Sequence, residues 1–500
     1  MRGHTPIVID KFNGLYRRGE PDTTPTDHFY DCENVQFTGT SGFGTRPGIE
    51  PSQNISGPLG NIVRIYNYVT QTENTLLVLI TGGFLFHVIN EGATVLGPIL
   101  TIPAMTDFAF IPFAGRAYIS PFTSYGALPD RLEKGLEDDF LYVYMGDGTP
   151  ARKAAGNPPT TGTLTVANGV GFTDAGFHLF GVVYETDTGF LTAPARFTGF
   201  TTSAAFGVSF TAIPVSPDSF VVARRLVMTR VIPNYNGDET GYTYYFIPDG
   251  RIPNNTATTL DNITVFDADL LDDATHLIDN YAEIPAGAVL SSYHNRLVLS
   301  TTFDDISLAL VSNAGEPEAI SQIDGLLIAP LDGNPLTNFQ DLRDILYGFK
   351  RNRTMSWVDN GDVPSTWPLT MIDFGLGCPV HGVATVADSG ASNVDYLVVA
   401  SYRGIVIFNG RYIDPELTWK VVDLWMEQDQ DEFRRIQIVN DTVNKILYCV
   451  LPDFRLLYGN YANGLDQKKI RWAPWRYYIK VSTIAMFGVS TLIIGSEGGV

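Results

Sequence analysis

The residues of this sequence best suited to chemistry are its histidines and cysteines, and their spacing decides whether they could act together. Seven histidines occur, and neither His28 with Cys32 nor His294 with Arg296 has a third partner close by in the sequence. A metal centre needs several ligands at short spacings, and a nucleophile needs a base held by an orienting group. The three cysteines are Cys32, Cys378 and Cys449. They are too far apart for a zinc motif and too few for a disulfide framework, so we expect structural histidines and reduced, structural cysteines.

Three acidic or glycine-rich stretches also invite a functional role, and each departs from the pattern that the role requires. "DADLLDDATHLIDN" (267–280) is rich in carboxylates but lacks the glycine and the alternating ligands of an EF-hand loop. "VYMGDGTPARK" (143–153) has a Gly-Asp-Gly turn but neither a following helix nor the Gly-Lys-Ser/Thr end of a phosphate-binding loop. "SWVDNGDVPSTW" (356–367) approaches the S-x-D-x-G-x-x-W box of sialidase propellers, but Asp359 stands one place too late. We therefore predict no enzymatic activity, no metal site and no cofactor.

Two groups of basic residues stand out against an acidic chain. Lys and Arg number 33 and Asp and Glu 54, so the formal net charge is −21, which disfavours tight binding of a nucleic-acid backbone. One basic group lies in "GFKRNR" (348–353), and the other, in "DQKKIRWAPWRYYIK" (466–480), is interleaved with aromatic residues. A separate arginine, Arg46, precedes Pro-Gly in "NVQFTGTSGFGTRPG" (34–48), at a stiff corner between two strands.

These basic residues and their aromatic neighbours allow two interpretations. They could form a hairpin corner, solvated turns and a strand whose aromatic side chains fill the core. They could instead contact acidic surfaces of neighbouring subunits, where Arg and Trp often anchor an interface. The candidate interface of the second interpretation consists of Arg46, Lys350, Arg351, Arg353, Lys468, Lys469, Arg471, Trp472, Trp475 and Arg476.

The elements that must position these residues are β-hairpins. The chain has 48 glycines, 30 prolines, 24 tyrosines and 30 phenylalanines among many Val, Ile and Thr, a composition typical of β-structure. Two apolar runs joined by a tight turn recur at 75–89, 345–358, 396–410 and 445–464, and another begins at 490. These are more strands than one sandwich needs, so the repeat predicts an all-β chain built as a β-propeller of six to eight blades.

A segment of different character interrupts the hairpins. After the linker "AGNPPTTGT" (155–163), strands follow at the spacing expected of a small antiparallel sandwich. We predict an N-terminal strand and the first blades in 1–156, an inserted, fibronectin-like β-sandwich in 157–277, and the remaining blades in 278–500. We also predict that "ENVQF" (33–37) completes the last blade, because the final hairpin has no partner strands and a propeller must cover its edges.

The order of several short stretches resembles a known family. "FNGLYRR" (12–18), "ENVQF" and "RPG" come first, "VYMGDGTPARKA" precedes the sandwich and "YETDTGFLTAPA" (184–195) lies inside it. "YHNRLVLST" (293–301) and "YRGIVIFNG" (402–410) follow. In this order they resemble the large β-propeller structural proteins of tailed bacteriophages, and are most similar to tail nozzle or tail hub proteins.

What the resemblance implies is a virion component, made in the host cytoplasm and located in the tail. It implies a ring of copies, expected to be a hexamer, in contact with adjoining tail or portal-adaptor proteins, through which phage DNA passes without tight binding. Two alternatives remain open: a receptor- or glycan-binding tail protein, and a propeller glycosidase acting through a pair of carboxylates. No run of about 18 consecutive apolar residues is present, so we expect no membrane span.

Overall fold

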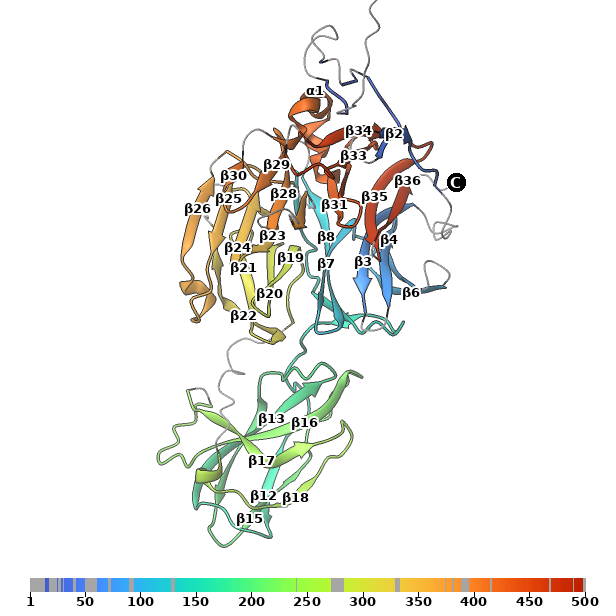
Figure 1. The fold of residues 1–500 in the computed structure, drawn as a ribbon. Helices are drawn as coiled ribbons and strands as arrows, with labels where there is room; N and C mark the ends of the chain where they lie inside the picture. The colour runs from blue at the N-terminus through green and yellow to red at the C-terminus, as the bar shows by residue number, and fades with distance from the viewer. Residues whose placement is uncertain are drawn as a thin grey trace, which may run out of the picture. The chain divides into compact units, whose positions relative to one another are not determined.

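The computed structural model shows a chain whose regular secondary structure, in the described residues, is almost all β-strand (Figure 1). The residues that it describes are 14–17, 25, 28–29, 31–38, 42–49, 61–70, 73–89, 94–126, 131–239, 241–270, 283–328, 333–373, 375–379, 382–387, 395–413, 416–466, 469–488 and 490–497. The chain divides into two compact units, one made of 1–152, 285–309 and 326–500, the other of 153–284 and 310–325.

Seven antiparallel sheets in the described residues form the blades of a β-propeller, which confirms the predicted fold. Blade 1 contains β3 (Ile62–Val69), β4 (Asn74–Ile80), β5 (Phe84–Ile89) and β6 (Thr94–Thr101). Blade 2 contains β7 (Asp107–Phe113), β8 (Arg116–Tyr125), β10 (Tyr142–Tyr144) and β11 (Arg152–Lys153), with β9 (Leu132–Gly135) also paired to β8. Blade 3 contains β19 (Gly287–Tyr293), β20 (Arg296–Thr302), β21 (Leu308–Asn313) and β22 (Glu316–Leu327).

The remaining blades follow in chain order. Blade 4 contains β23 (Leu336–Leu342), β24 (Ile345–Lys350), β25 (Thr354–Trp357) and β26 (Leu369–Asp373). Blade 5 contains β27 (Val383–Ala387), β28 (Asp395–Ser401), β29 (Gly404–Phe408) and β30 (Tyr412–Ile413). Blade 6 contains β31 (Gln437–Asp441), β32 (Ile446–Val450), β33 (Leu456–Asn460) and β34 (Arg471–Trp475). Blade 7 has two described strands, β35 (Lys480–Phe487) and β36 (Thr491–Glu497).

Tight turns between consecutive strands hold the blades in register. At the β4–β5 turn, Gly82 and Gly83 have φ angles of +92° and +75°. A Cβ atom on Gly83 would lie 1.8 Å from the carbonyl oxygen of Ile102, so only glycine fits. The β19–β20 turn places His294 and Asn295 at φ angles of +46° and +57°, the left-handed pair that suits the twist of a two-residue hairpin.

Blade 7 closes the ring, but not in the predicted way. β35 lies between the first strands of blades 6 and 1: the Ile65 amide donates to Thr483 Oγ1 (3.1 Å), and Thr483 Oγ1 donates to Gln437 (2.8 Å). The predicted strand donor, "ENVQF", instead forms β1 (Val35–Thr38), which pairs with β2 (Gly42–Thr45). β1 lies against β34 of blade 6, where the Asn34 amide donates to Pro474 O (2.9 Å). The prediction that this segment completes the last blade is therefore wrong.

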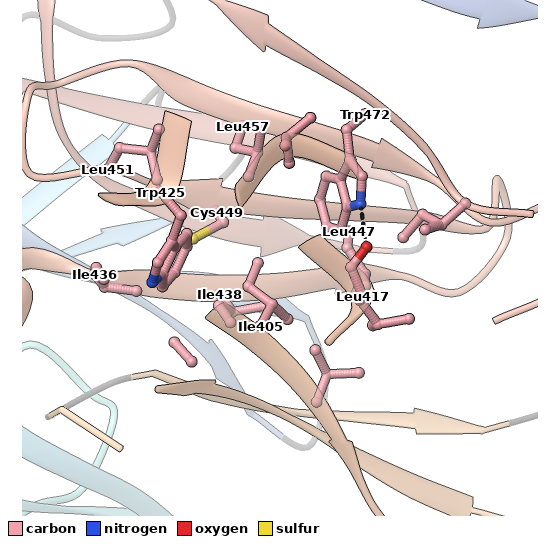
Figure 2. Close-up of a cluster of buried hydrophobic side chains, with 14 of the residues drawn as sticks. Ile405, Leu417, Trp425, Ile436, Ile438, Leu447, Cys449, Leu451, Leu457 and Trp472 are labelled. Atoms are coloured by element: carbon pink, nitrogen blue, oxygen red, sulfur yellow. Dashed lines mark hydrogen bonds between the residues drawn. The ribbon is translucent and has the colours of Figure 1, made fainter. Parts of the chain in front are cut away.

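Large aromatic residues fill the space between blades 5 and 6 (Figure 2). A short helical stretch, η6 (Leu417–Val421) followed by α1 (Val422–Met426), packs its apolar residues into this space. Trp472 of β34 donates its indole N–H to Leu417 O (2.8 Å), and Trp425 donates to Ser401 O (3.1 Å). Both indoles are buried and have their polar atom satisfied, as burial of tryptophan requires.

The second compact unit contains a β-sandwich. One sheet has the order β12–β15–β18, from β12 (Thr165–Gly169), β15 (Gly207–Thr211) and β18 (Leu260–Ile263). The other has the order β14–β13–β16–β17, from β13 (Gly176–Thr186), β14 (Ala195–Thr202), β16 (Val221–Thr229) and β17 (Tyr244–Ile252). Phe180 of one sheet and Phe210 of the other meet edge to face in the core between them, with ring centroids 5.5 Å apart. The boundaries predicted for the three segments stay a prediction.

Candidate functional site

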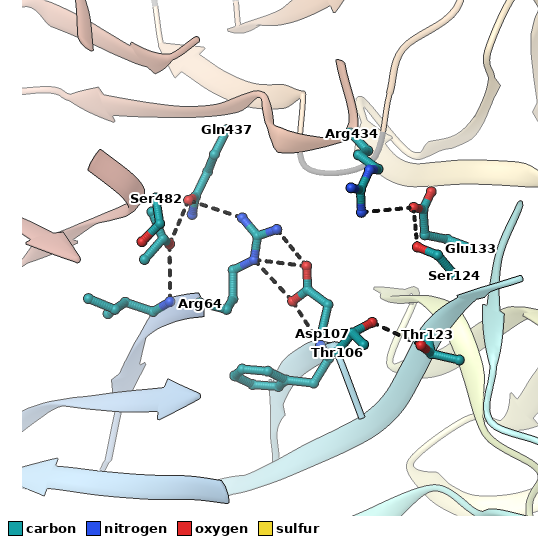
Figure 3. A network of polar contacts seen from close by, with 12 residues as sticks. Arg64, Thr106, Asp107, Thr123, Ser124, Glu133, Arg434, Gln437 and Ser482 are labelled. Atoms are coloured by element: carbon teal, nitrogen blue, oxygen red, sulfur yellow. Dashed lines mark hydrogen bonds and ion pairs between the residues drawn. The ribbon is translucent and has the colours of Figure 1, made fainter. Parts of the chain in front are cut away.

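The propeller encloses a polar pocket where the first strands of blades 1, 2 and 7 meet the segment before β31. Its volume is about 180 Å³, below the roughly 300–1,000 Å³ of most small-molecule sites. The side chains that line it are those of Val63, Arg64, Thr106, Asp107, Phe122, Ser124, Glu133, Arg434, Arg435, Val450, Leu451, Phe454, Val481, Ser482 and Glu497. Figure 3 shows several of the polar members, among them Arg64, Asp107, Glu133 and Arg434, with their hydrogen bonds and ion pairs.

The strongest contact in the pocket is the ion pair between Arg64 of β3 and Asp107 of β7. The guanidinium Nη2 lies 2.5 Å from Asp107 Oδ2, and Nε lies 3.0 Å from Oδ1. Arg64 is only 5% exposed. Burial by itself would lower the pKa of Arg64, but the adjacent Asp107 carboxylate keeps that pKa above its usual value. The pair therefore remains charged and joins blade 1 to blade 2.

Gln437, the first residue of β31, extends this contact to two further blades. Its Oε1 accepts from Arg64 Nη1 (3.3 Å), from Thr483 Oγ1 (2.8 Å) and from the Ile484 amide (3.0 Å). Ser482 Oγ donates to Ile62 O (2.7 Å) beside it. One buried hydrogen-bond network thus links the first strands of blades 1, 2, 6 and 7.

A second group of charges comes from η7 (Gln430–Arg435), which leads into β31. Glu432 accepts from Arg434 (3.0 Å) and from Arg435 (2.9 Å). Burial raises the pKa of Glu432, but the two arginines outweigh that effect and hold the pKa below its usual value. Arg434 also lies 3.9 Å from Glu133, and Arg435 lies 3.4 Å from Glu497.

This geometry suits cohesion between blades better than proton transfer. A general acid of a glycosidase needs a carboxyl whose pKa is raised so that it carries a proton near neutral pH. Asp107 accepts from an arginine and from its neighbouring amide at Phe108 (2.8 Å), and Glu133 accepts from Ser124 Oγ (2.8 Å). Both carboxylates therefore act as hydrogen-bond acceptors in this network.

The predicted interface residues separate into buried and exposed sets. Lys350, Arg471, Trp472 and Trp475 are buried within blades 4 and 6. The first interpretation of these four, as core of the blades, agrees with their burial, since a buried side chain cannot meet a partner without rearrangement. Trp475 donates to Val35 O (2.7 Å) and stacks on a tyrosine ring within blade 6.

The other predicted interface residues lie nearer the surface. Arg351 is half-buried and donates to Arg131 O (2.6 Å), and Arg353 is half-buried. Lys469 and Arg476 are exposed. Their role in an interface stays a prediction. Arg46 and Lys468 complete the set: Arg46 is half-buried over the ring of Tyr477, at 4.0 Å, and Lys468 lies outside the described residues.

The pocket residues were not identified from the sequence. Arg64, Asp107, Glu133 and Arg434 come from distant parts of the chain, so no short spacing connects them. One local signal does exist, because Arg64 is the single charged residue of the largely apolar and aromatic strand "IVRIYNYV". A charged residue in a buried strand is rare unless it is paired, and this could have suggested an internal ion pair without naming its partner.

The stretches considered for chemistry have local structural roles in the described residues. Asp147 of the Gly-Asp-Gly turn accepts from the amide and hydroxyl of Thr149 (3.0 and 2.6 Å). Asp359 lies 3.5 Å from Arg296. Asp267 accepts from the Val231 amide (2.9 Å), and the later part of that acidic stretch, 271–280, lies outside the described residues.

The cysteines, possible metal ligands and helical segments show no feature of a functional site in the described residues. All three cysteines are free, and burial, helped by Asp31, raises the pKa of the Cys32 thiol to about 12. Among the described residues, no group of three or more His, Cys, Asp or Glu side chains is placed to hold a metal ion. In the same part of the chain, every helical segment is too short to span a bilayer.

His87 of β5 gives a testable pH dependence. Its ring is buried beside Tyr68 and Tyr144, and its Nδ1 lies 2.8 Å from the Tyr144 hydroxyl. Burial disfavours the charged imidazole and lowers the pKa of His87 to about 4. In the unfolded chain the pKa is about 6.5. Between these values the unfolded state gains a proton that the folded state does not, so stability is lost as the pH falls through this window.

We expect this histidine to cost about 1–3 kcal/mol of folding free energy between pH 7 and pH 4. Guanidinium titrations followed by tryptophan fluorescence at both pH values measure the loss. Carboxylates also titrate in this range, so the decisive quantity is the difference between the wild type and His87→Gln, which keeps a polar partner for Tyr144. Equal pH dependence in both proteins would contradict the assignment.

Comparisons with known proteins give structural matches only. No family model matches the chain, and no curated protein does. Similar solved structures include Hsv2 of Kluyveromyces lactis (11% identity, 83% of this chain and 97% of that chain, TM-score 0.31). They also include U3-55K (8% identity, 86% of this chain and 89% of that chain, TM-score 0.38). The WD40 repeats of RRP9 match with 8% identity over 86% of this chain and 88% of that chain, with a TM-score of 0.38. At these identities and scores the matches say nothing about activity or partners.

These comparisons correct the resemblance drawn from the sequence. None of the similar structures named above, which include the WD40 repeats of RRP9 and Hsv2 of Kluyveromyces lactis, is a phage tail nozzle or hub protein. The prediction of a tail component is therefore wrong, and with it the virion location, the channel for phage DNA and the receptor- or glycan-binding tail alternative. The evidence for the propeller fold is the set of seven sheets described above.

Proposed function

We propose that this protein is a non-catalytic scaffold that acts by binding other proteins, with the propeller as its rigid platform. The observation that carries the proposal is the polar network of the pocket lined by Arg64 and Asp107. Its arginines and carboxylates bond to one another and join blades 1, 2, 6 and 7. Charged groups that neutralise each other in this way support a stabilising role in the ring rather than acid–base chemistry.

The size of the pocket supports the same proposal. About 180 Å³ holds several water molecules but not a sugar ring with its neighbours. The surfaces of the two units are then the places where partners could bind, as in many β-propellers whose loops and edges present binding residues.

A turnover assay tests this proposal. The purified chain is incubated with a panel of 4-methylumbelliferyl glycosides, beside an Asp107→Asn variant that keeps the shape of the pocket. We expect no release of the fluorophore above the variant in any member of the panel. Hydrolysis by the wild type that disappears in a folded Asp107→Asn protein would overturn the proposal, because the pocket would then act as a carboxylate-dependent active site.

A further inference from the structure

Three loops of the sandwich unit expose a group of large apolar side chains, which we call the apolar tip. Its members are Val170, Phe172, Phe206 and Phe266, and they are between 38% and 78% exposed. Val170 and Phe172 follow β12, Phe206 precedes β15, and Phe266 follows β18. The ends of these three adjacent strands bring the loops to one end of the sheet.

Hydrogen bonds show that the three loops are direct neighbours. The Phe172 amide donates to Thr264 Oγ1 (3.3 Å), and the Val265 amide donates to Phe172 O (3.2 Å). Thr173 Oγ1 donates to Phe206 O (3.3 Å), which ties in the third loop. These bonds hold the backbone in place, so the apolar side chains are presented to solvent by an ordered frame.

Such a patch is costly for a protein that works alone. Monomeric proteins rarely expose contiguous apolar patches larger than a few hundred Å², and those that do often use them for binding. Covering apolar surface contributes roughly 25 cal/mol per Å². Covering the apolar tip with a partner surface would therefore contribute favourable binding free energy.

The charges around the apolar tip restrict that partner. The loop segments 169–174, 203–207 and 261–269 contain four aspartates and neither lysine nor arginine. Their negative charge disfavours anionic lipids and nucleic acid. It favours a surface that combines aromatic residues with a basic rim. The four aspartates are Asp174, Asp261, Asp267 and Asp269.

The same chain carries a surface of that description on its propeller unit, which we call the basic patch. Tyr478 of this patch is 78% exposed. Arg46 and Arg476 adjoin one another, since Arg46 Nη2 donates to Arg476 O (3.1 Å). Lys480 adds a third cation and is exposed. Arg476 lies 3.1 Å from Glu33, and its side chain is still 63% exposed.

We propose that the apolar tip of one copy docks onto the basic patch of a second copy. The inference rests on the proposed function and names its partner. Val170, Phe172 and Phe206 would bury against Tyr478, while the aspartates meet the basic rim. The two surfaces differ, so the contact is heterologous, and repeated use of it builds a ring or a filament. Part of its strength is electrostatic and is therefore weakened by salt.

Sedimentation velocity of the full-length chain tests the contact directly. Runs cover concentrations up to about 100 µM, where a contact with a micromolar dissociation constant is populated. We expect association that increases with concentration and weakens at high salt. The tip variant Phe172→Ser/Phe206→Ser and the patch variant Arg476→Glu/Tyr478→Ser should each weaken association at least tenfold. Val443→Ser, another exposed apolar residue of the propeller unit, is the matched control and should leave association unchanged.

Mixing the two variants distinguishes this contact from others. The tip variant keeps a working patch, and the patch variant keeps a working tip, so an equimolar mixture should form a dimer and nothing larger. Circular dichroism confirms that each variant is folded.

A wild type that stays monomeric throughout, or variants that associate like the wild type, would overturn the proposal. Binding of the apolar tip to phosphatidylcholine vesicles without self-association would also overturn it in favour of a lipid partner. None of these outcomes involves turnover, so this inference and the proposed function can fail separately.

Discussion

Replacing Asp107 with alanine is expected to lower the free energy of unfolding of the propeller by about 3–5 kcal/mol. The reason is the charge that remains: Arg64 is 5% exposed and would keep a buried guanidinium without its carboxylate. An uncompensated buried charge costs much more than the net contribution of the intact pair. All six tryptophans lie between 357 and 475, so intrinsic fluorescence follows the propeller unit alone during guanidinium unfolding.

Two further variants separate the charge effect from simple loss of packing. Arg64→Met/Asp107→Leu removes both charges and should recover a large part of the loss, because hydrophobic residues often replace a buried ion pair at little cost. Arg17→Gln breaks an exposed ion pair with Glu427 (2.8 Å) and should change stability by less than about 1 kcal/mol. If Asp107→Ala and Arg17→Gln had equal effects, the network would not be holding the blades together.

The hairpins show what could be predicted from the sequence. Runs such as "TLLVLI" and "FLFHVI" are apolar on both faces and flank a Gly-Gly turn, and they became β4 and β5 as expected. Strand pairing of this kind is local, because the turn sets the register of both strands. The number of such hairpins therefore predicted a propeller before any long-range contact was known.

The ion-pair network shows what could not be predicted. Arg64 of blade 1 and Gln437 of blade 6 are 373 residues apart in the sequence, and their contact exists only because blade 7 closes the ring between these two blades. The spacing of residues in the sequence does not predict which side chains meet where the ring closes. The same limit explains the wrong position of "ENVQF": its apolar alternation fits any open edge, and only the packing of Phe37 beside Tyr458 selects blade 6.

The resemblance to phage tail proteins failed for a related physical reason. Some of the stretches that carried it are tight turns between two apolar strands, such as "YHNRLVLST" around the His294–Asn295 turn. Two-residue hairpins with left-handed backbone angles draw on a small set of residues, mainly Asn, Asp and Gly. Unrelated propellers can therefore contain similar turn sequences. Because the blades repeat along the chain, such turn sequences can also occur in a similar order without common descent.

Trp472 decides between the two interpretations of the aromatic strand "RWAPW". Its indole is fully buried against Leu447, Leu457 and the η6 segment, and it donates to Leu417 O. We expect Trp472→Ala to lower the free energy of unfolding by about 3–5 kcal/mol, because a large cavity and an unpaired carbonyl remain. Trp472→Phe keeps much of the packing and loses the hydrogen bond, so a loss of about 1–3 kcal/mol is expected.

Tyr478→Ala is the matched control, because it removes an aromatic side chain that is 78% exposed only six positions away. A surface substitution of this kind should change stability by about 0.5 kcal/mol or less, while weakening association if the basic patch is the docking surface. The two variants should therefore have opposite profiles in fluorescence-detected unfolding and in sedimentation. Trp472→Ala that left stability intact and abolished association would reverse the assignment, because a residue that contributes nothing to the blade but is needed between copies belongs to an interface.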